Sequence, residues 1–488
     1  MAIYFLAAAN DYLGNAASNS NDGRDPAGFD LSGASYDDTG HADGDYRIES
    51  SGAFSGYTWE SGDLIYIDGG TGITVGLYEI AEKVSNDVIR LTASAGSDAS
   101  DLSSSSGPFA TLNYALKDGG TGNTMSAGDE LRVMNDGSHE IDNEITTSGM
   151  DGTSTDRVLV RGVDDRGVPF TDEMDRTNRV EIRCAASTFT GTYMLKADNV
   201  RWTWQGLKFN CHDSGGTDRA NRAAVIGLSG WGSIWMNCEF ENGSSGDMVY
   251  VYYYDQIVYC DFHDNTDGSG CNMSSGNGGR FYFCRFYDNN KNGLDANATS
   301  SNSGWVMGCE FFRNGSGSTH AGLKFNNAGE NNVVVAVNCV MYDNYTDGMR
   351  VSGELNRGNG LIYNCSFVGN GQDGSSGYGL RMQSTDYPET WGHGRLIDFN
   401  HFHNNYDDEA YAEPGGAIDV AGINDGAIGQ NNQTGDPSFA DADNGDFTPG
   451  SSSPLIQNGL GGFNIGTGVH AAGGSGGAGR LVNGGLVS

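Results

Sequence analysis

Six cysteines in the middle of the chain recur at intervals of 22 to 30 residues, each within the same short pattern. An apolar stretch leads to the cysteine, one variable residue follows it, and then come Phe or Met and a polar turn. The six are Cys238, Cys260, Cys284, Cys309, Cys339 and Cys365. An internal period of roughly 20 to 50 residues is the signature of a solenoid, in which each repeat packs mainly on its two neighbours. This repeat limits the possible folds more than any other feature of the sequence.

The repeat has the periodicity of strands rather than helices. Each cysteine shares one face with the Phe or Met two residues later, because side chains alternate between the two faces of a strand. A second short strand follows a glycine in several repeats, at residues 293–296, 322–325, 348–351 and 379–382. Short strands joined by Gly, Asn and Asp turns leave no room for helical crossovers. The sequence predicts an all-β fold, a parallel β-helix in which equivalent residues stack about 4.8 Å apart.

An asparagine column runs beside the cysteine column. Asparagine stands five residues after most of the repeated cysteines, and Asn400 takes the place of the next cysteine. The column consists of Asn265, Asn289, Asn314, Asn344, Asn370 and Asn405. Asparagine tolerates the left-handed backbone that a sharp turn between strands demands. Stacked asparagine side chains can also hydrogen-bond from one coil to the next. We expect this column to line one turn of every coil.

The cysteine column is expected to belong to the core. A free cysteine behaves as a small buried hydrophobe. Neighbouring Cβ atoms in a parallel stack lie side by side about 4.8 Å apart, which is too wide and wrongly aimed for a disulfide. The chain has no CxxC pair and no Cys/His cluster, so we predict neither a metal site nor a cofactor. Reduced thiols fit folding in a cytoplasm.

Three regions divide the chain. Residues 1–106 contain alternating segments with glycine turns, residues 107–460 contain the repeats, and residues 461–488 form a Gly-rich tail with an apolar end. The helix expected at 107–116, the strand runs that follow it and the segment 436–459 resemble the opening and ending of pectate-lyase-like right-handed β-helix proteins. The resemblance implies a right-handed parallel β-helix over 107–460, preceded by a small β-rich module. It implies no particular activity, because lyases, hydrolases and adhesins share this fold.

One pair of carboxylates has the spacing of a catalytic pair. If Cys and Phe point inward, the residue between them points outward, which places Glu239 and Asp261 on adjacent coils about 5 Å apart. Retaining glycosidases hold their acid and nucleophile at this separation, and mutual repulsion would raise one pKa and supply a general acid. Lys208 and Arg285 extend the same column and favour ionisation of both carboxylates. The alternative is therefore a charge-balanced stack on the surface.

The next outward column is rich in aromatic residues and includes Tyr287, Phe312 and Tyr342. Outward rings of this kind need a cover, which would be a loop of the same chain or a subunit interface. The alternative is a platform on which sugar rings stack. The stretch 249–255 is apolar on both faces and predicts a further interface; its tyrosines are Tyr250, Tyr252 and Tyr254.

Composition argues against several classes of partner. The chain carries 63 acidic and 27 basic residues, a net charge of −36, which argues against nucleic acid and anionic membranes. No apolar run approaches the length of a membrane span, so we predict no membrane insertion. The start of the chain lacks the basic and apolar segments of a signal peptide.

The β-helix, the N-terminal module, the apolar tail and the missing signal peptide together resemble bacteriophage virion surface proteins, such as tailspikes, receptor-binding proteins or capsid-surface spikes and decoration proteins. The resemblance implies synthesis in the cytoplasm, release by lysis and a place on the virion. It also implies a homotrimer that contacts other virion proteins or binds a host surface polysaccharide. Two other functions fit the sequence: an extracellular polysaccharide lyase or hydrolase, and a bacterial adhesin or surface-filament subunit. Whether the protein is an enzyme stays open, and we expect a non-enzymatic role.

Overall fold

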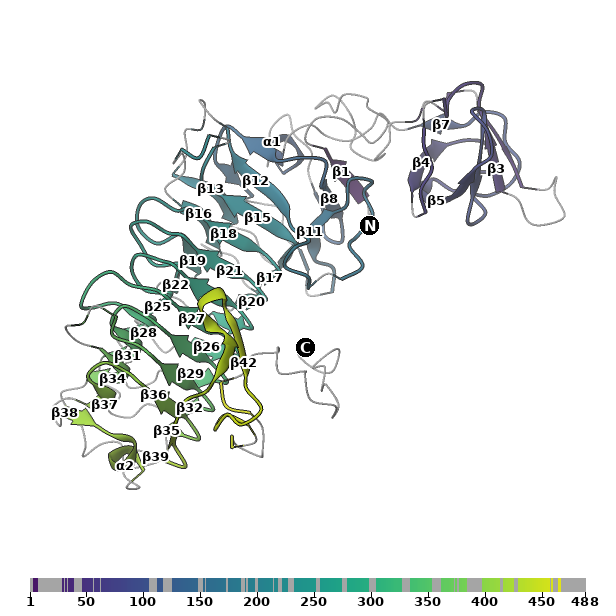
Figure 1. Cartoon of the computed structure of the whole chain (residues 1–488). Helices are drawn as coiled ribbons and strands as arrows, with labels where there is room; N and C mark the ends of the chain where they lie inside the picture. The colour runs from purple at the N-terminus through teal and green to yellow at the C-terminus, as the bar shows by residue number, and fades with distance from the viewer. Residues whose placement is uncertain are drawn as a thin grey trace. The chain divides into compact units, whose positions relative to one another are not determined.

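The computed structural model describes residues 3–7, 29–104, 112–116, 125–147, 152–297, 304–326, 334–352, 361–383, 397–424 and 429–466, with short gaps inside several of these ranges. The chain divides into two compact units, residues 1–271 and residues 272–488. Each unit contains coils of three short strands, and strands at equivalent positions of successive coils stack into three sheets (Figure 1).

The coils of the first unit build three parallel stacks of strands. The first sheet contains β1 (Ile3–Leu6), β8 (Glu130–Met134), β11 (Val158–Val163), β14 (Trp202–Gln205), β17 (Ile234–Met236) and β20 (Gln256–Val258). The second contains β9 (His139–Ile141), β12 (Val180–Cys184), β15 (Leu207–Asn210), β18 (Glu239–Glu241) and β21 (Asp261–His263). The third contains β10 (Ile145–Thr146), β13 (Tyr193–Ala197), β16 (Arg222–Ile226), β19 (Val249–Val251) and β22 (Cys271–Met273).

The second unit repeats this plan and ends in a hairpin. Its first sheet contains β23 (Arg280–Tyr282), β26 (Gly304–Met307), β29 (Val334–Val337), β32 (Leu361–Tyr363), β35 (Ile397–Asp398) and β39 (Gly429–Gln430). The second contains β24 (Arg285–Tyr287), β27 (Glu310–Phe312), β30 (Val340–Tyr342), β33 (Ser366–Val368), β36 (His401–His403) and β40 (Gln433–Thr434). The third contains β25 (Leu294–Asn297), β28 (Ala321–Asn326), β31 (Asp347–Ser352), β34 (Tyr378–Gln383), β37 (Asp408–Ala412) and the antiparallel β38 (Gly416–Ile418). The remaining elements are helix α2 (Val420–Ile423), strands β41 (Phe439–Asp441) and β42 (Asp446–Pro449), and the 3-10 helix η1 (Ala442–Asn444) between them.

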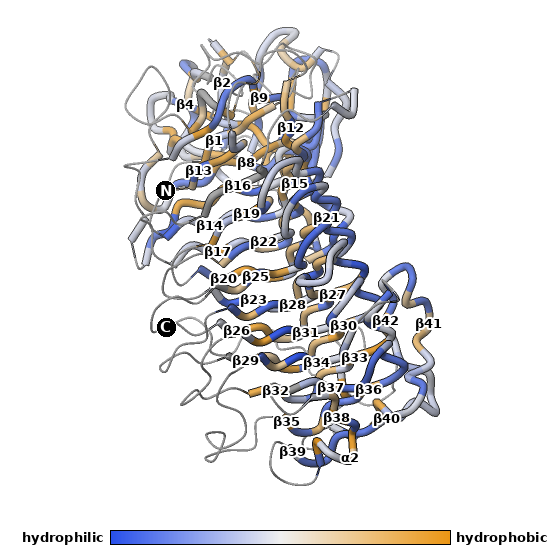
Figure 2. The backbone as a smooth tube through the Cα atoms, turned by 90° about the vertical axis from the view of Figure 1, so that its left-hand side faces the viewer, coloured by the Kyte–Doolittle hydropathy of each residue, from blue (hydrophilic) through white to orange (hydrophobic). Residues whose placement is uncertain are grey.

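The predicted fold class, a right-handed parallel β-helix, is confirmed. Apolar residues recur from strand to strand along the stack (Figure 2). The inward phenylalanines pack ring on ring, with centroids 5.4 Å apart between Phe209 and Phe240 and 4.8 Å apart between Phe286 and Phe311. These distances match the spacing of one coil, so stacked side chains fill the core.

The N-terminal region differs from the predicted division at residue 106. Strand β1 pairs in parallel with β8, so residues 3–6 belong to the β-helix rather than to the module. The module is a separate six-stranded antiparallel sheet: β2 (Ser35–Asp37), β3 (Tyr46–Glu49), β6 (Val88–Leu91), β5 (Gly76–Lys83), β4 (Leu64–Gly69) and β7 (Ser103–Ser104). The helix expected at 107–116 is described as α1 (Leu112–Ala115). Within the described part of the chain, no helix is long and apolar enough to cross a membrane.

All nine cysteines are free thiols in the interior. The backbone N–H of Cys238 lies 3.4 Å from Cys260 Sγ, and the same distance separates the N–H of Cys284 from Cys309 Sγ. The Sγ atoms of the six repeated cysteines also contact main-chain carbonyl oxygens, for example Val337 O at 3.4 Å from Cys339 Sγ. The predicted core column of reduced thiols is therefore present in both units.

The asparagine column forms a hydrogen-bonded ladder in the second unit. The side-chain amides of Asn289, Asn314, Asn344 and Asn370 each donate to the next asparagine oxygen at 2.9 to 3.1 Å. In the first unit, Asn265 donates to two main-chain carbonyl oxygens instead. The predicted left-handed conformation of these asparagines is wrong, because it belongs to the preceding residue, for example Arg313 with φ of 53°. That residue turns the chain, and the asparagine then points inward to satisfy main-chain groups.

Candidate functional site

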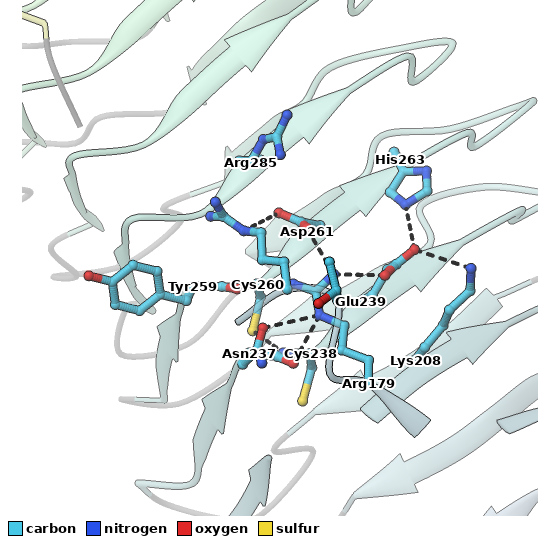
Figure 3. Close-up of polar contacts among 12 residues, drawn as sticks. Arg179, Lys208, Asn237, Cys238, Glu239, Tyr259, Cys260, Asp261, His263 and Arg285 are labelled. Carbon is cyan, nitrogen blue, oxygen red and sulfur yellow. Dashed lines mark hydrogen bonds and ion pairs between the residues drawn. The ribbon is translucent and has the colours of Figure 1, made fainter. Parts of the chain in front are cut away.

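Arg179 links the two carboxylates that the sequence singled out. It lies immediately before β12 and reaches β18 and β21, the strands that begin with Glu239 and Asp261 (Figure 3). Its Nη1 atom donates to Glu239 Oε2 at 2.7 Å and to Asp261 Oδ2 at 2.8 Å, while its Nε atom donates to the Asn237 carbonyl oxygen at 3.1 Å. The Arg179 side chain is 3% exposed. A single buried cation therefore bridges both carboxylates.

Other cations complete the charge balance. Arg176 Nε lies 3.1 Å from Asp261 Oδ1. Lys208 Nζ lies 3.3 Å from Glu239 Oε1 and 3.0 Å from Glu241 Oε1. Arg285, which the sequence placed in the same column, lies in the second unit with its Nε 3.4 Å from Glu310 Oε2. The alternative of a charge-balanced stack thus describes the first-unit cluster well, although its face is largely buried rather than exposed.

These cations keep Glu239 ionised. Burial by itself would raise the pKa of Glu239, but the hydrogen bond from His263 and the charges of Arg179 and Lys208 outweigh it and hold that pKa well below its usual range. A carboxyl group with a lowered pKa carries no proton at neutral pH, so Glu239 is not suited to be a general acid. The expected acid pair therefore lacks the proton donor that glycoside hydrolysis needs on Glu239.

Glu239, Glu241 and His263 bring three potential metal-ligand atoms within 4.8 Å of one another. Burial would lower the pKa of His263, but hydrogen bonds with Asp264 and Glu239 raise it to about 9. Its two ring nitrogens lie 2.7 Å from Asp264 Oδ2 and 3.1 Å from Glu239 Oε1, so the protonated ring donates to both. An imidazolium has no lone pair to offer, and the Lys208 ammonium already contacts both glutamates. This arrangement fits an ion-pair network and does not fit a metal ion.

The network predicts a specific dependence of stability on pH. His263 has a folded-state pKa raised to about 9, so its contribution is full below its unfolded value of about 6.5 and is lost as the pH rises through about 9. Glu239 has a lowered pKa, so its contribution is full above about 4.5 and is lost as the pH falls further. We expect the Tm to fall between pH 7 and pH 10, and His263→Gln to flatten this fall.

Thermal unfolding followed by circular dichroism across this pH range provides the measurement. His212→Gln is the matched control, because His212 is a half-buried histidine of the same unit outside this network. An equally steep alkaline fall in wild type and His263→Gln would contradict the assignment.

The hairpin of β41 and β42 covers the outward aromatic column of the second unit (Figures 1 and 2). Phe312 is only 1% exposed and packs edge-on against Phe447, with ring centroids 5.4 Å apart. Tyr287 stacks on Phe312 at 4.9 Å, and the hydroxyl of Tyr342 donates to Asp443 at 2.9 Å. A loop of the same chain is thus the cover, and Phe312 has no free face for a sugar ring.

The other predicted interface residues are the tyrosines of the stretch 249–255 and the C-terminal tail. Tyr250 lies in β19 and is half-buried, whereas Tyr252 and Tyr254 lie outside the described residues. The tail is described only at residues 464–466, where Ile465 N donates to Leu455 O and Gly466 N donates to Asn364 O. These contacts are made within the chain itself.

A column of cations on the third sheet of the second unit was missed in the sequence. Lys324 on β28, Arg350 on β31 and Arg381 on β34 are direct neighbours in the parallel register, and we call these three residues the basic ladder. Lys324 and Arg381 are half-buried, and Arg350 is 4% exposed. The basic ladder stands out because the chain as a whole is strongly acidic.

Aromatic rings and one carboxylate hold the arginines of the basic ladder. The Arg381 guanidinium carbon lies 4.7 Å from the ring centroid of Tyr378 and 5.3 Å from that of Tyr411. Asp347, which is fully buried, accepts from Arg350 Nε at 2.7 Å and from Arg381 Nε at 3.1 Å. Asp347 thus accepts from two guanidinium groups, and Asp295 on β25 is the register neighbour of Lys324. The three cations of the basic ladder therefore outnumber the two carboxylates beside them.

The pKa of His320 reflects the positive charges around the basic ladder. Its pKa is lowered by burial and further by the positive charges of Lys324, Lys291 and Arg350. Among the described residues, no carboxylate lies within ion-pair distance of Lys291 or Lys324. The sequence already contains this column, because a cation stands third in each of the repeated strands 322–325, 348–351 and 379–382.

No protein-family model matches the chain, and neither does any curated protein. Among solved structures, the pectate lyase Pel9A is similar with a TM-score of 0.46 and 16% identity, over 72% of this chain and 87% of that one. An alginate lyase from Paenibacillus sp. str. FPU-7 has a TM-score of 0.39 and 11% identity, over 66% and 95%. ORF18 of Geobacillus virus E2 has a TM-score of 0.28 and 12% identity, over 64% and 54%. At this level the likenesses say nothing about activity.

Proposed function

We propose that this chain is a bacteriophage surface protein that binds an acidic host-surface polysaccharide without cleaving it. The observation that carries the proposal is the basic ladder with its flanking tyrosines. Guanidinium and ammonium groups recognise carboxylates, and tyrosine rings offer an apolar face to a sugar. The chain has a net charge of −36, so a local surplus of positive charge favours the binding of an anionic ligand at this one place.

The network around Glu239 argues against cleavage at this carboxylate pair. Arg179 and Lys208 neutralise the acid pair, and the lowered pKa of Glu239 removes its proton at neutral pH. The alternative of a polysaccharide lyase or hydrolase at this pair therefore has less support. The alternative of a bacterial adhesin shares the binding chemistry and differs in the particle that carries the protein.

The proposed place on a virion rests on the resemblance of the sequence to bacteriophage surface proteins. Nine buried free thiols are compatible with folding in a reducing cytoplasm, as a phage protein would do. We propose a homotrimer that contacts other virion proteins. Mass spectrometry of purified particles and native mass measurement of the isolated protein test this part, and a monomer that copurifies with no particle would contradict it.

Binding to immobilised polysaccharides tests the central function. We expect wild type to bind uronate-bearing polymers, with an affinity that falls as salt rises. Lys324→Gln combined with Arg381→Gln should lower that affinity by roughly 100-fold, because each removes one charge-assisted contact. Lys196→Gln is the matched control, since Lys196 lies on the third sheet of the first unit and pairs with Glu144. Equal binding of neutral polymers, or a fall in polymer mass during incubation, would contradict the proposal.

A further inference from the structure

Two tyrosines project from the corner of the second unit that precedes its third sheet. Tyr345 and Tyr406 are 37% and 55% exposed, and both belong to the exposed large hydrophobic side chains of the described residues. Each directly follows an asparagine of the ladder, the buried Asn344 or the half-buried Asn405. Their backbone N–H groups donate at 2.9 Å to carbonyl oxygens of the preceding coil. The backbone beneath both exposed rings is therefore fixed, although the rings themselves reach into solvent.

Glycines occupy the equivalent positions on the alternate coils. Gly315 and Gly371 donate their N–H groups to the ladder in the same way as the tyrosines do. A Cβ atom at Gly371 would lie 2.4 Å from the Cβ of Tyr406, and one at Gly315 would lie 3.4 Å from the Cβ of Tyr345. The order along the stack is thus Gly, Tyr, Gly, Tyr. The two tyrosines are two coils apart, about 10 Å, with Gly371 at the equivalent position of the coil between them.

This spacing suits a polymer of sugar rings. Exposed aromatic rings on a rigid backbone, without an apolar partner, are typical of a binding surface rather than of a core. A pyranose ring presents an apolar C–H face that stacks on tyrosine, and two coils correspond to about two sugar units. Each tyrosine lies two residues before the start of its strand, β31 or β37. The rings therefore border the sheet that carries the basic ladder.

We propose that Tyr345 and Tyr406 stack on alternate pyranose rings of a polysaccharide that runs parallel to the stacking direction of the coils. The inference rests on the proposed function and adds a second recognition element to it. The basic ladder binds the carboxylates of the polymer, whereas the tyrosines stack on the faces of its sugar rings. Gly371 is needed between the two tyrosines, because a side chain at this position would displace Tyr406.

Four substitutions, Tyr345→Ala, Tyr406→Ala, Tyr406→Phe and Gly371→Ala, test the inference in titrations with a uronate-bearing oligosaccharide. Each tyrosine-to-alanine change should weaken binding about 10-fold, which corresponds to about 1.4 kcal/mol of lost aromatic stacking. Tyr406→Phe should bind like wild type, and Gly371→Ala should resemble Tyr406→Ala. The dependence of affinity on salt should stay unchanged in these variants and become weaker in Arg381→Gln.

Trp305→Ala is the matched control, because Trp305 is 40% exposed and lies on the first sheet. Thermal unfolding should be unchanged in both tyrosine-to-alanine variants, which remove only exposed rings. Unaltered affinity in these variants, with binding lost in Arg381→Gln, would overturn the stacking role and leave the proposed function intact. An equal loss in Trp305→Ala would also overturn it. Absence of any saccharide binding by wild type would overturn the proposed function together with this inference.

Discussion

Replacing Arg179 by methionine is expected to destabilise the protein by about 3–5 kcal/mol. The substitution keeps the apolar stem of the side chain but removes the cation that bridges Glu239 and Asp261. Both carboxylates lie in a mostly buried site, where an uncompensated charge is costly. The shift of the urea unfolding midpoint, multiplied by the slope of the unfolding transition, measures the loss.

Two further variants make the Arg179 experiment specific. Arg183→Met removes an arginine of β12, the strand that follows Arg179; Arg183 pairs with Glu140 at an exposed site, and its loss should cost less than about 1 kcal/mol. Adding Glu239→Gln and Asp261→Asn to Arg179→Met should recover part of the stability, because the unpaired charges are then gone. Equal small losses for Arg179→Met and Arg183→Met would show that the bridge contributes little.

Replacing Asn314 by alanine is expected to cost about 4 kcal/mol. The amide of Asn314 donates to Phe286 O at 2.8 Å, to Phe312 O at 3.2 Å and to Asn344 Oδ1 at 3.1 Å. Its oxygen accepts from the side chain of Asn289 at 2.9 Å. Alanine would leave these buried groups without partners in the middle of the ladder. Urea unfolding of the full chain, followed by far-UV circular dichroism, measures the change.

Asn444→Ala is the control for the ladder experiment. Asn444 is exposed and donates only to the neighbouring Asp441 at 2.8 Å, so its removal should change stability by less than about 0.5 kcal/mol. If Asn314→Ala cost no more than this control, the ladder would be a consequence of the fold rather than a source of its stability.

Local repetition made the fold predictable from the sequence. The cysteine and asparagine columns stand at a fixed offset, so they determine both the strand period and the register between coils. The residue that takes the left-handed conformation was assigned wrongly, because the asparagine and its predecessor both belong to the same short turn. Strand β1 was also missed, since its pairing with β8 joins segments more than a hundred residues apart.

The candidate sites depended on contacts that no local pattern reveals. Arg179 stands 60 residues before Glu239, and nothing in the intervening sequence indicates that it reaches β18. The hairpin that covers Phe312 likewise comes from residues 439–449. The basic ladder differs, because the repeated strands already contained its three cations in register. Reading charge along each column of a solenoid would have found it.

A structure of the protein with a bound acidic oligosaccharide is the most direct test of the proposed function. The proposed function predicts a saccharide that runs across β28, β31 and β34, with carboxylates beside Lys324 and Arg381 and with unbroken glycosidic bonds. A saccharide bound instead at Glu239 and Asp261, or cleaved products in place of the intact chain, would contradict it.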